Sequence, residues 1–400
     1  MKNALPPKNL LSWLRRSRWS ILVLALAAAL FLFVRLSILR SEDSGELTGD
    51  FVEYEKATVL TILSDSTYSD PASDGGYRGT QQMTVHVESG RYQGLDLLVE
   101  NYVLPMYGVP VHEGDSVALM ISTYSSGEVR ASVFEFNRIP GLLIVLGLFF
   151  LVTVLVGRKT GLKSFFALLL TMGCVVYILF PLLLRGAPTL PTVFFTCVYI
   201  TVVSFTILGG IERKSLCAML GTVAGTAIAM LFGLLGQALC RVDGLRISDV
   251  EPLLLERVAA YPDGPQMGLR GLLVAGILIS ALGAVMDVSM SISSSLEEIH
   301  SANPGLGFKA LFRSGMNIGQ DMVGTMTNTL ILAFLGSGFT LILYLYFLGL
   351  SRYQLLPSAY LSMEVISGVS SSIGMILAIP LTAFISAALI ERKTPQPKKK

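Results

Sequence analysis

Hydrophobic residues follow two different patterns along this chain, and the change between them divides it. From residue 140 onward apolar residues run almost without interruption, in stretches long enough to cross about 30 Å of hydrocarbon as helices. We expect spans at 141–156, 163–184, 191–210, 215–239, 271–290, 322–350 and 365–390. A further apolar stretch at 19–39 follows a basic N-terminus that ends in a Trp-Arg cluster. The pattern predicts a polytopic α-helical membrane protein with about eight transmembrane helices.

Residues 41–138 alternate instead between apolar and polar positions, which is typical of half-buried strands. Five such runs occur, and turn sequences including SDPASDGG, HEGD and SSGE separate them. The five runs are KATVLTIL, QQMTVHVES, LDLLVEN, DSVALMIST and VRASVFEF. This spacing predicts a small all-β domain, an OB-like barrel, between the first and second spans.

Four regions follow from these patterns. Residues 1–40 form a basic N-terminus and membrane anchor, for which a cleaved signal peptide is the less favoured alternative. Residues 41–138 form the β domain, 139–390 a seven-helix membrane domain and 391–400 a basic tail. Lys and Arg are concentrated in the termini and in alternate loops, so we expect both termini in the cytoplasm and the β domain outside it.

Composition supports this assignment and narrows the chemistry. Charged residues make up 14% of the chain and hydrophobic residues 52%, whereas soluble domains carry about 25% charge. The four cysteines fall in or beside apolar segments, where they are read as small apolar residues. The three histidines are far apart in sequence, and there is neither a phosphate-binding loop nor a dinucleotide fingerprint. We therefore expect no cofactor, no metal, no nucleic acid and no enzymatic activity, with membrane lipid as a partner.

Two late segments carry polar side chains at helical spacing. Asp287, Ser291, Ser294 and Glu298 form one stripe, and Asn317, Asp321, Thr325 and Asn328 form another. Charges in hydrocarbon cost several kcal/mol, so they normally face a protein interior or water. We expect Asp287 near the inner end of its span and Asp321 at the inner start of the next, in the cytoplasmic half of the bundle.

The stripes favour a transporter or permease. In this interpretation they line a path for a small molecule or ion, with Asp287 and Asp321 as proton or cation carriers and Glu364 at the outer mouth. The candidate pathway residues are Asp287, Ser291, Ser294, Asn317, Asp321, Thr325, Asn328 and Glu364. A structural alternative leaves both aspartates wet or paired with Lys309 or Arg313 at the cytoplasmic helix ends.

Two further functions stay open. The β domain could act as a sensor or bind a membrane or cell-envelope protein, with the bundle as its anchor. An intramembrane aspartyl protease is a remote alternative, because NIGQD stands where those enzymes carry glycine-x-glycine-aspartate.

Local features of the last helices add two expectations. The segment 322–350 is longer than one span, so either Gly336-Ser337-Gly338 breaks it or it crosses as a tilted unbroken helix. The loop sequence NPGLGFKALFRSG suggests a separate surface helix before this span.

Several of these strings resemble the YibE/F family of bacterial multi-pass membrane proteins. They are GAVMDVSMSISSSLEEI, GMNIGQDMVGTMTNTLILAF and GVSSSIGMILAIPLTAFISA, and EGDSVALMI in the β domain is similar to the family's extracytoplasmic part. The resemblance implies the multi-pass architecture and a location in the bacterial cell membrane. It supplies neither an activity nor a substrate.

Overall fold

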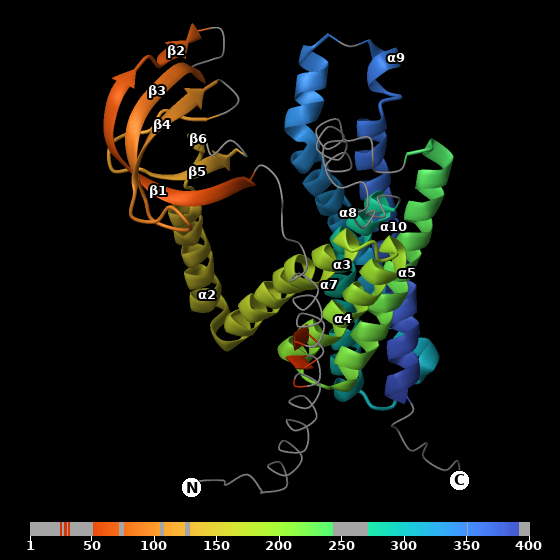
Figure 1. The fold of residues 1–400 in the computed structure, drawn as a ribbon. Coiled ribbons are helices and arrows are strands. Elements are labelled where there is room, and N and C mark those ends of the chain that lie inside the picture. Colours follow the sequence, from red (N-terminus) through yellow and green to blue (C-terminus); the bar gives the residue numbers. More distant parts are fainter. Residues whose placement is uncertain are drawn as a thin grey trace, which may run out of the picture. The chain divides into compact units, whose positions relative to one another are not determined.

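A computed structural model describes residues 25, 28–29, 31–32, 51–71, 76–104, 108–124, 129–242, 271–349 and 351–391. The chain divides into two compact units (Figure 1): residues 42–156, and residues 1–41 together with 157–400. Most of the predicted anchor 19–39 and the tail after residue 391 lie outside the described residues. Among those described in the anchor, Phe31 is helical and packs against the bundle.

The first unit is built on a closed β-barrel. Its strands are β1 (Phe51–Asp65), β2 (Tyr68–Asp70), β3 (Gly76–Val87), β4 (Asp96–Val103), β5 (Ser116–Thr123) and β6 (Val129–Phe136). The sheet order is β1-β5-β6-β4-β3-β2, and β1 also pairs with β3, which closes the barrel. The paired main strands are antiparallel except β4 and β6, which are parallel. The five predicted strands are all present.

The barrel core follows from the alternation of residues along these strands. Side chains at every second position, such as Met83, Val85 and Val87 on β3, are fully buried. Their neighbours Gln82 and Thr84 point to the other face. The predicted HEGD turn holds its shape because the His112 amide donates to the Asp115 carboxylate at 2.7 Å.

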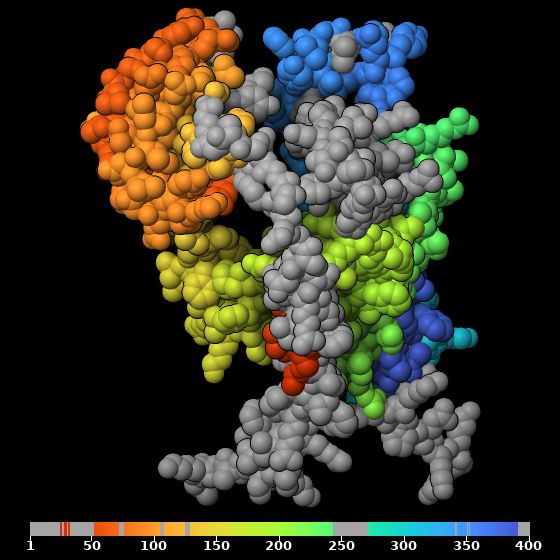
Figure 2. Space-filling model, viewed as in Figure 1, coloured from red at the N-terminus to blue at the C-terminus, as the bar shows by residue number. Residues whose placement is uncertain are grey.

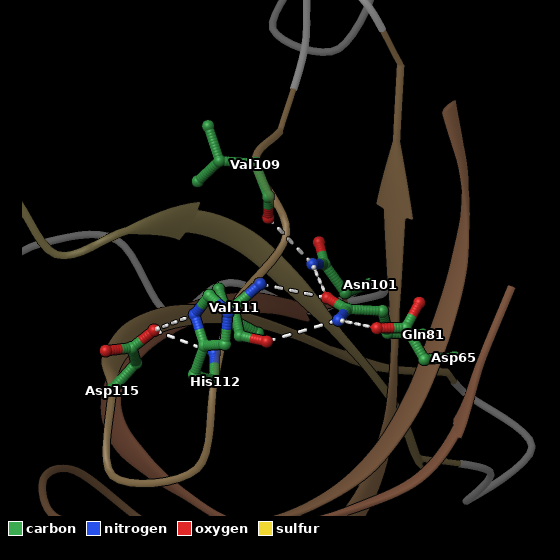
Figure 3. A network of polar contacts seen from close by, with 7 residues as sticks. All are labelled: Asp65, Gln81, Asn101, Val109, Val111, His112 and Asp115. Carbon is green, nitrogen blue, oxygen red and sulfur yellow. Dashed lines mark hydrogen bonds and ion pairs between the residues drawn. The ribbon is translucent and has the colours of Figure 1, made fainter. Parts of the chain in front are cut away.

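The buried Gln81 side chain holds the segment 109–111 against the barrel (Figure 3). The Gln81 amide donates to Asp65 Oδ2 at 2.8 Å and to the Val111 carbonyl at 3.1 Å. Its oxygen accepts from the Val111 amide and from Asn101 Nδ2, each at 3.0 Å, and Asn101 also donates to the Val109 carbonyl. Each polar atom of Gln81 is therefore paired, which offsets the cost of burying it.

The rest of the described chain is helical. The helices are α2 (Ile139–Cys174), the π-helix η2 (Val175–Leu179), α3 (Phe180–Leu184), α4 (Thr189–Gly209), α5 (Arg213–Cys240), α7 (Leu272–Ala302), α8 (Phe308–Phe347), α9 (Arg352–Leu355) and α10 (Ala359–Glu391). Six helical stretches in the described residues are long and apolar enough to span a membrane. They are Ile139–Leu184, Thr189–Gly209, Arg213–Cys240, Leu272–Ala302, Phe308–Thr340 and Ala359–Ile390.

The first of these stretches contains two of the predicted spans. Helix α2 is interrupted at Arg158, whose backbone has φ 48° and ψ −128°. This conformation is outside the helical region and is rare for a residue with a side chain. Residues 139–156 lie on the side of the interruption that belongs to the barrel unit. Their apolar side chains are almost all exposed within this unit, which suits a helix that contacts lipid.

The bundle is centred on α5, α7 and α10. Gly225 of α5 meets Gly374 of α10 so closely that a Cβ on Gly225 would lie 2.6 Å from Ala378 Cβ and 3.1 Å from the Gly374 carbonyl oxygen. The glycines are spaced by four residues with other small side chains, in the pattern Gly221, Gly225, Ala229, Gly233. Small residues at this spacing let membrane helices pack backbone to backbone.

Helix α8 corrects one expectation and decides between two others. It begins at Phe308, so the NPGLGFKALFRSG loop does not form a separate helix; most of it is the first turns of α8. The helix continues through Gly336-Ser337-Gly338 without a break. Gly338 is buried there because the Glu364 side chain of α10 packs over it, with Glu364 Cδ 3.5 Å from the position of a Cβ. The unbroken alternative therefore holds.

The C-terminal end of α8 extends past the end of α5 (Figure 1). The residues around the α8–α9 turn, in blue, form part of the surface in the space-filling view (Figure 2). Aromatic side chains dominate it, and Phe347 is 83% exposed. Aromatic residues at such a helix end are typical of a membrane–water interface.

Candidate functional site

The two predicted polar stripes both lie on the surface of the single chain. On α7, Asp287 and Glu298 are exposed and Ser291 and Ser294 are half-buried. The opposite side of α7 carries the buried residues Val285, Val288, Ser289 and Ile292. The stripe is thus a real face of the helix, as its spacing predicts, and it points away from the packed core.

The stripe on α8 is more exposed still. Asn317, Asp321, Thr325 and Asn328 all lie on the exposed side of the helix. The other side packs through Leu311, Gly315 and Gly319, and a Cβ on Gly319 would lie 2.0 Å from Ile379 Cγ2 of α10. No hydrogen bond or ion pair joins any two of the eight predicted pathway residues in the described structure.

Contacts between helices give the depth of Asp287 in the bundle. Ser289 lies beside Gly221 of α5 and Thr382 of α10, and Thr382 Oγ1 donates to Ser289 Oγ at 3.1 Å. Gly221 follows Arg213, the first residue of α5, by eight positions, or about 12 Å of helix. Asp287 is two residues farther from that end, so it lies about 15 Å along the bundle from Arg213.

The same reasoning places Asp321 at a similar depth. Gly319 contacts Ile379, and the Gly374–Gly225 and Thr382–Gly221 contacts align Ile379 with α5 near Ala224. Asp321 is two residues beyond Gly319 and therefore lies about 20 Å from the Arg213 end. The two aspartates share one level to within about one helical turn. Neither lies at a helix end, because α7 and α8 extend beyond the expected spans, and the cytoplasmic position of this level stays a prediction.

Glu364 is separate from this level. It lies in the first turns of α10, close to Gly338, whereas Ile379 is fifteen residues farther along the same helix. That separation corresponds to about 22 Å. The structure therefore groups the aspartates by depth and leaves Glu364 near the other end of the bundle.

Comparison with known proteins gives a family. A model of the YibE/F-like protein family matches residues 145–392, which is more than half of the chain. The chain belongs to the YibE/F family. No curated protein and no solved structure matches it. Both aspartate stripes and the whole α5–α7–α10 core of this YibE/F protein fall within the matched residues.

The YibE/F core also contains polar groups at the contacts between its helices. Ser280 of α7 and Ser371 of α10 lie 3.2 Å apart through their hydroxyl oxygens, and Ser289 and Thr382 form the second pair. Thr222 and Ser386 are buried, and the Thr222 hydroxyl has no hydrogen-bond partner among the described residues. The sequence signal for these positions was the four-residue spacing of small residues, which marks close helix contacts where short hydroxyl side chains fit.

These hydroxyls and the aspartates have different surroundings. The hydroxyl pairs are enclosed between α5, α7 and α10 and stabilise the helix contacts. In the described residues of this YibE/F protein, neither aspartate is held by a hydrogen bond or a cation. Asp287 and Asp321 are thus exposed carboxylates set apart from the enclosed hydroxyl pairs.

Proposed function

We propose that this integral membrane protein is a permease in which Asp287 and Asp321 carry protons or another cation. One observation carries the proposal: both carboxylates lie about 15–20 Å into the bundle, at one level, exposed and without a hydrogen bond or ion pair to any other described residue. That depth lies within the apolar stretch of α5, which spans Arg213–Cys240.

The energetics favour a transport role over a structural one. A charged carboxylate in hydrocarbon costs several kcal/mol, so a group that only filled space would be replaced by an apolar residue at a gain in stability. An exposed carboxylate at this depth avoids that cost by binding a proton or another cation, or by meeting water that enters the bundle. The first two of these routes bring an ion into the bundle, and the third brings water to the carboxylate.

A pH jump on a solid-supported membrane tests the role of the aspartates. Proteoliposomes of the wild-type protein should give a transient current as protons enter or leave the carboxylates, and Asp287→Asn and Asp321→Asn should each reduce it. Glu298→Gln is the matched control, because Glu298 shares the α7 stripe but lies near the helix end. Equal currents from wild type and both Asn variants, all correctly folded, would refute the proposal.

The orientation belongs to the same proposal. Arg213 and Lys214 at one end of the bundle support a cytoplasmic location for that end, with the β domain on the other side of a bacterial cell membrane. The barrel's strand order and its parallel β4–β6 pair support its assignment as OB-like. In a variant whose exposed Cys240 is replaced by serine, a single cysteine introduced in the barrel should react with a membrane-impermeant maleimide in intact cells. Labelling only after lysis would indicate the opposite orientation, with the β domain in the cytoplasm.

A partner-binding role for the β domain is the second candidate. Tyr54 of β1 and Phe134 of β6 are more than half exposed and meet edge to face, with ring centroids 4.9 Å apart. Exposed aromatic pairs of this kind are typical anchors of protein interfaces. Substituting both by serine should leave the pH-jump current intact and abolish co-purification of an envelope partner. Recovery of the same partners by both proteins would exclude this surface.

A further inference from the structure

Helix α8 has two contrasting faces. Leu311, Gly315 and Gly319 pack against the bundle, and Gly315 is so close that a Cβ on it would lie 2.8 Å from Ala383 Cβ. The opposite face is exposed along the helix. Its exposed residues are Asn317, Asp321, Gly324, Asn328, Ile331 and Leu335.

The exposed face has the spacing of a helix–helix seam. Its residues follow one another at intervals of four, three, four, three and four, which is the heptad repeat of a left-handed helix pair. Gly324 lies in the middle, and a Cβ placed there would meet nothing within 4 Å. A glycine with open space on a membrane helix is typical of a position where another backbone approaches.

The seam lies within Phe308–Thr340, a stretch of α8 that is long and apolar enough to span a membrane. Asp321 is about 20 Å along the bundle from Arg213, and Asn328 is about 10 Å farther. Two asparagines and an aspartate facing lipid would leave their hydrogen-bonding groups unsatisfied. A second helix on this face removes that cost.

We propose that this face packs against α8 of a second copy of the chain, as a parallel pair about a two-fold axis. All copies share one orientation in the membrane, so equivalent residues meet at equal depth. The asparagine side chain is both donor and acceptor, so Asn317 and Asn328 each pair with their own equivalent, as asparagines do at coiled-coil seams. Gly324 faces Gly324, and Ile331 and Leu335 complete the seam with apolar contacts.

The pairing also changes the chemistry of the proposed permease. Two Asp321 carboxylates face each other across the axis, and like charges in low dielectric favour a shared proton or a bound cation. The ion site then consists of one residue from each copy and is incomplete in a single chain. This last step rests on the proposed function, whereas the interface itself stands without it.

Cysteine cross-linking in membranes tests the interface. Cys240, the exposed one of the four cysteines, is first replaced by serine; the other three are buried. Gly324→Cys and Asn328→Cys should then each form a disulfide-linked dimer on mild oxidation. Ala333→Cys is the matched control, because Ala333 is also exposed on α8 but lies about 120° around the helix from Asp321. It should remain monomeric.

Several results would overturn the proposal. They are equal cross-linking at all three positions, no cross-linking at either seam position, or an adduct whose mass differs from twice that of the chain. Mass photometry of the detergent-solubilised protein gives a second measure, and Asn328→Leu should lower the dimer fraction. Monomeric protein with normal pH-jump currents would reject the interface and leave the proposed function standing. Dimers that give no pH-jump current would support the interface and reject the proposed function.

Discussion

The contact between Gly225 and Gly374 allows a quantitative prediction for the bundle. Substituting Gly225 by alanine places a methyl group 2.6 Å from Ala378 Cβ and 2.7 Å from Val285 Cγ1. Carbon atoms prefer separations of about 3.5–4.0 Å, so the neighbouring helices must move by about 1 Å. The movement also strains the Thr382–Ser289 hydrogen bond, which is 3.1 Å long and one turn away.

The expected loss is about 2 kcal/mol. Overpacking of a filled core costs about 1–3 kcal/mol, and a gap of 0.5–1 Å removes a quarter to a half of each separated van der Waals contact. Replacing glycine by alanine in a helix returns at most about 1 kcal/mol through helix propensity. At about 2–4 °C per kcal/mol for a domain of this size, the melting temperature should fall by roughly 4–8 °C.

To measure this shift, the detergent-solubilised protein is heated to a series of temperatures, and the fraction that remains folded is determined by size-exclusion chromatography. Gly276→Ala in α7 is the control, because a Cβ on Gly276 meets nothing within 4 Å. It should leave the melting temperature unchanged or raise it slightly. If Gly225→Ala melts at the same temperature as Gly276→Ala, the close contact between α5 and α10 does not determine the stability of the bundle.

Two further predictions concern the β domain. Gln81→Ala should destabilise the barrel by about 3–5 kcal/mol, because it leaves the buried Val111 amide without its acceptor and removes one of the two acceptors of the Asn101 side chain. Hydrogen exchange of barrel peptides in the full chain measures this loss of stability. Gln82→Ala is the control, because Gln82 lies on the exposed face of β3 and its substitution should change exchange little. Similar effects of Gln81→Ala and Gln82→Ala would contradict the role of the Gln81 network. The hydrogen bonds from Thr67 lower the pKa of Asp65 below its usual 3.8, and the hydrogen bond from Gln81 contributes. The Asp65 carboxylate therefore stabilises the folded barrel above about pH 4. That contribution is lost as the pH falls through the pKa of Asp65 in the folded state. Asp65→Asn should therefore make barrel stability less dependent on pH below about 4, as followed by acid unfolding, and an acid transition unchanged from wild type would exclude the linkage.

The strands were predictable because alternation and turn residues act locally. Runs such as QQMTVHVES bury every second side chain, and the structure does the same along β3. Strand β2 was missed because its three residues, Tyr68–Asp70, are too few to show a period of two. Gln81 was unpredictable as a core residue, since its partners Val111 and Asn101 come together only when the barrel closes.

The helices show a different limit. The spacing of Asp287 and Asp321 identified real helix faces, but periodicity does not say which neighbour covers a face. Their depth depends on the contacts of Ser289 with Gly221 and of Gly319 with Ile379, which join helices distant in sequence. The start of α8 at Phe308 was missed because its first turns contain Lys309 and Arg313, which lower the local hydropathy.

The apolar helix before Arg158 has an evolutionary and practical consequence. Its side chains at 142–156 are nearly all exposed within the barrel unit, so few of them take part in the packing of that unit. The positions in α5 and α10 are restricted by shape, atom against atom, whereas these positions are restricted mainly by their affinity for lipid. Many apolar sequences of equal length satisfy that condition. Substitutions should accumulate freely in this helix, and it is a suitable place to exchange the barrel of one family member for that of another.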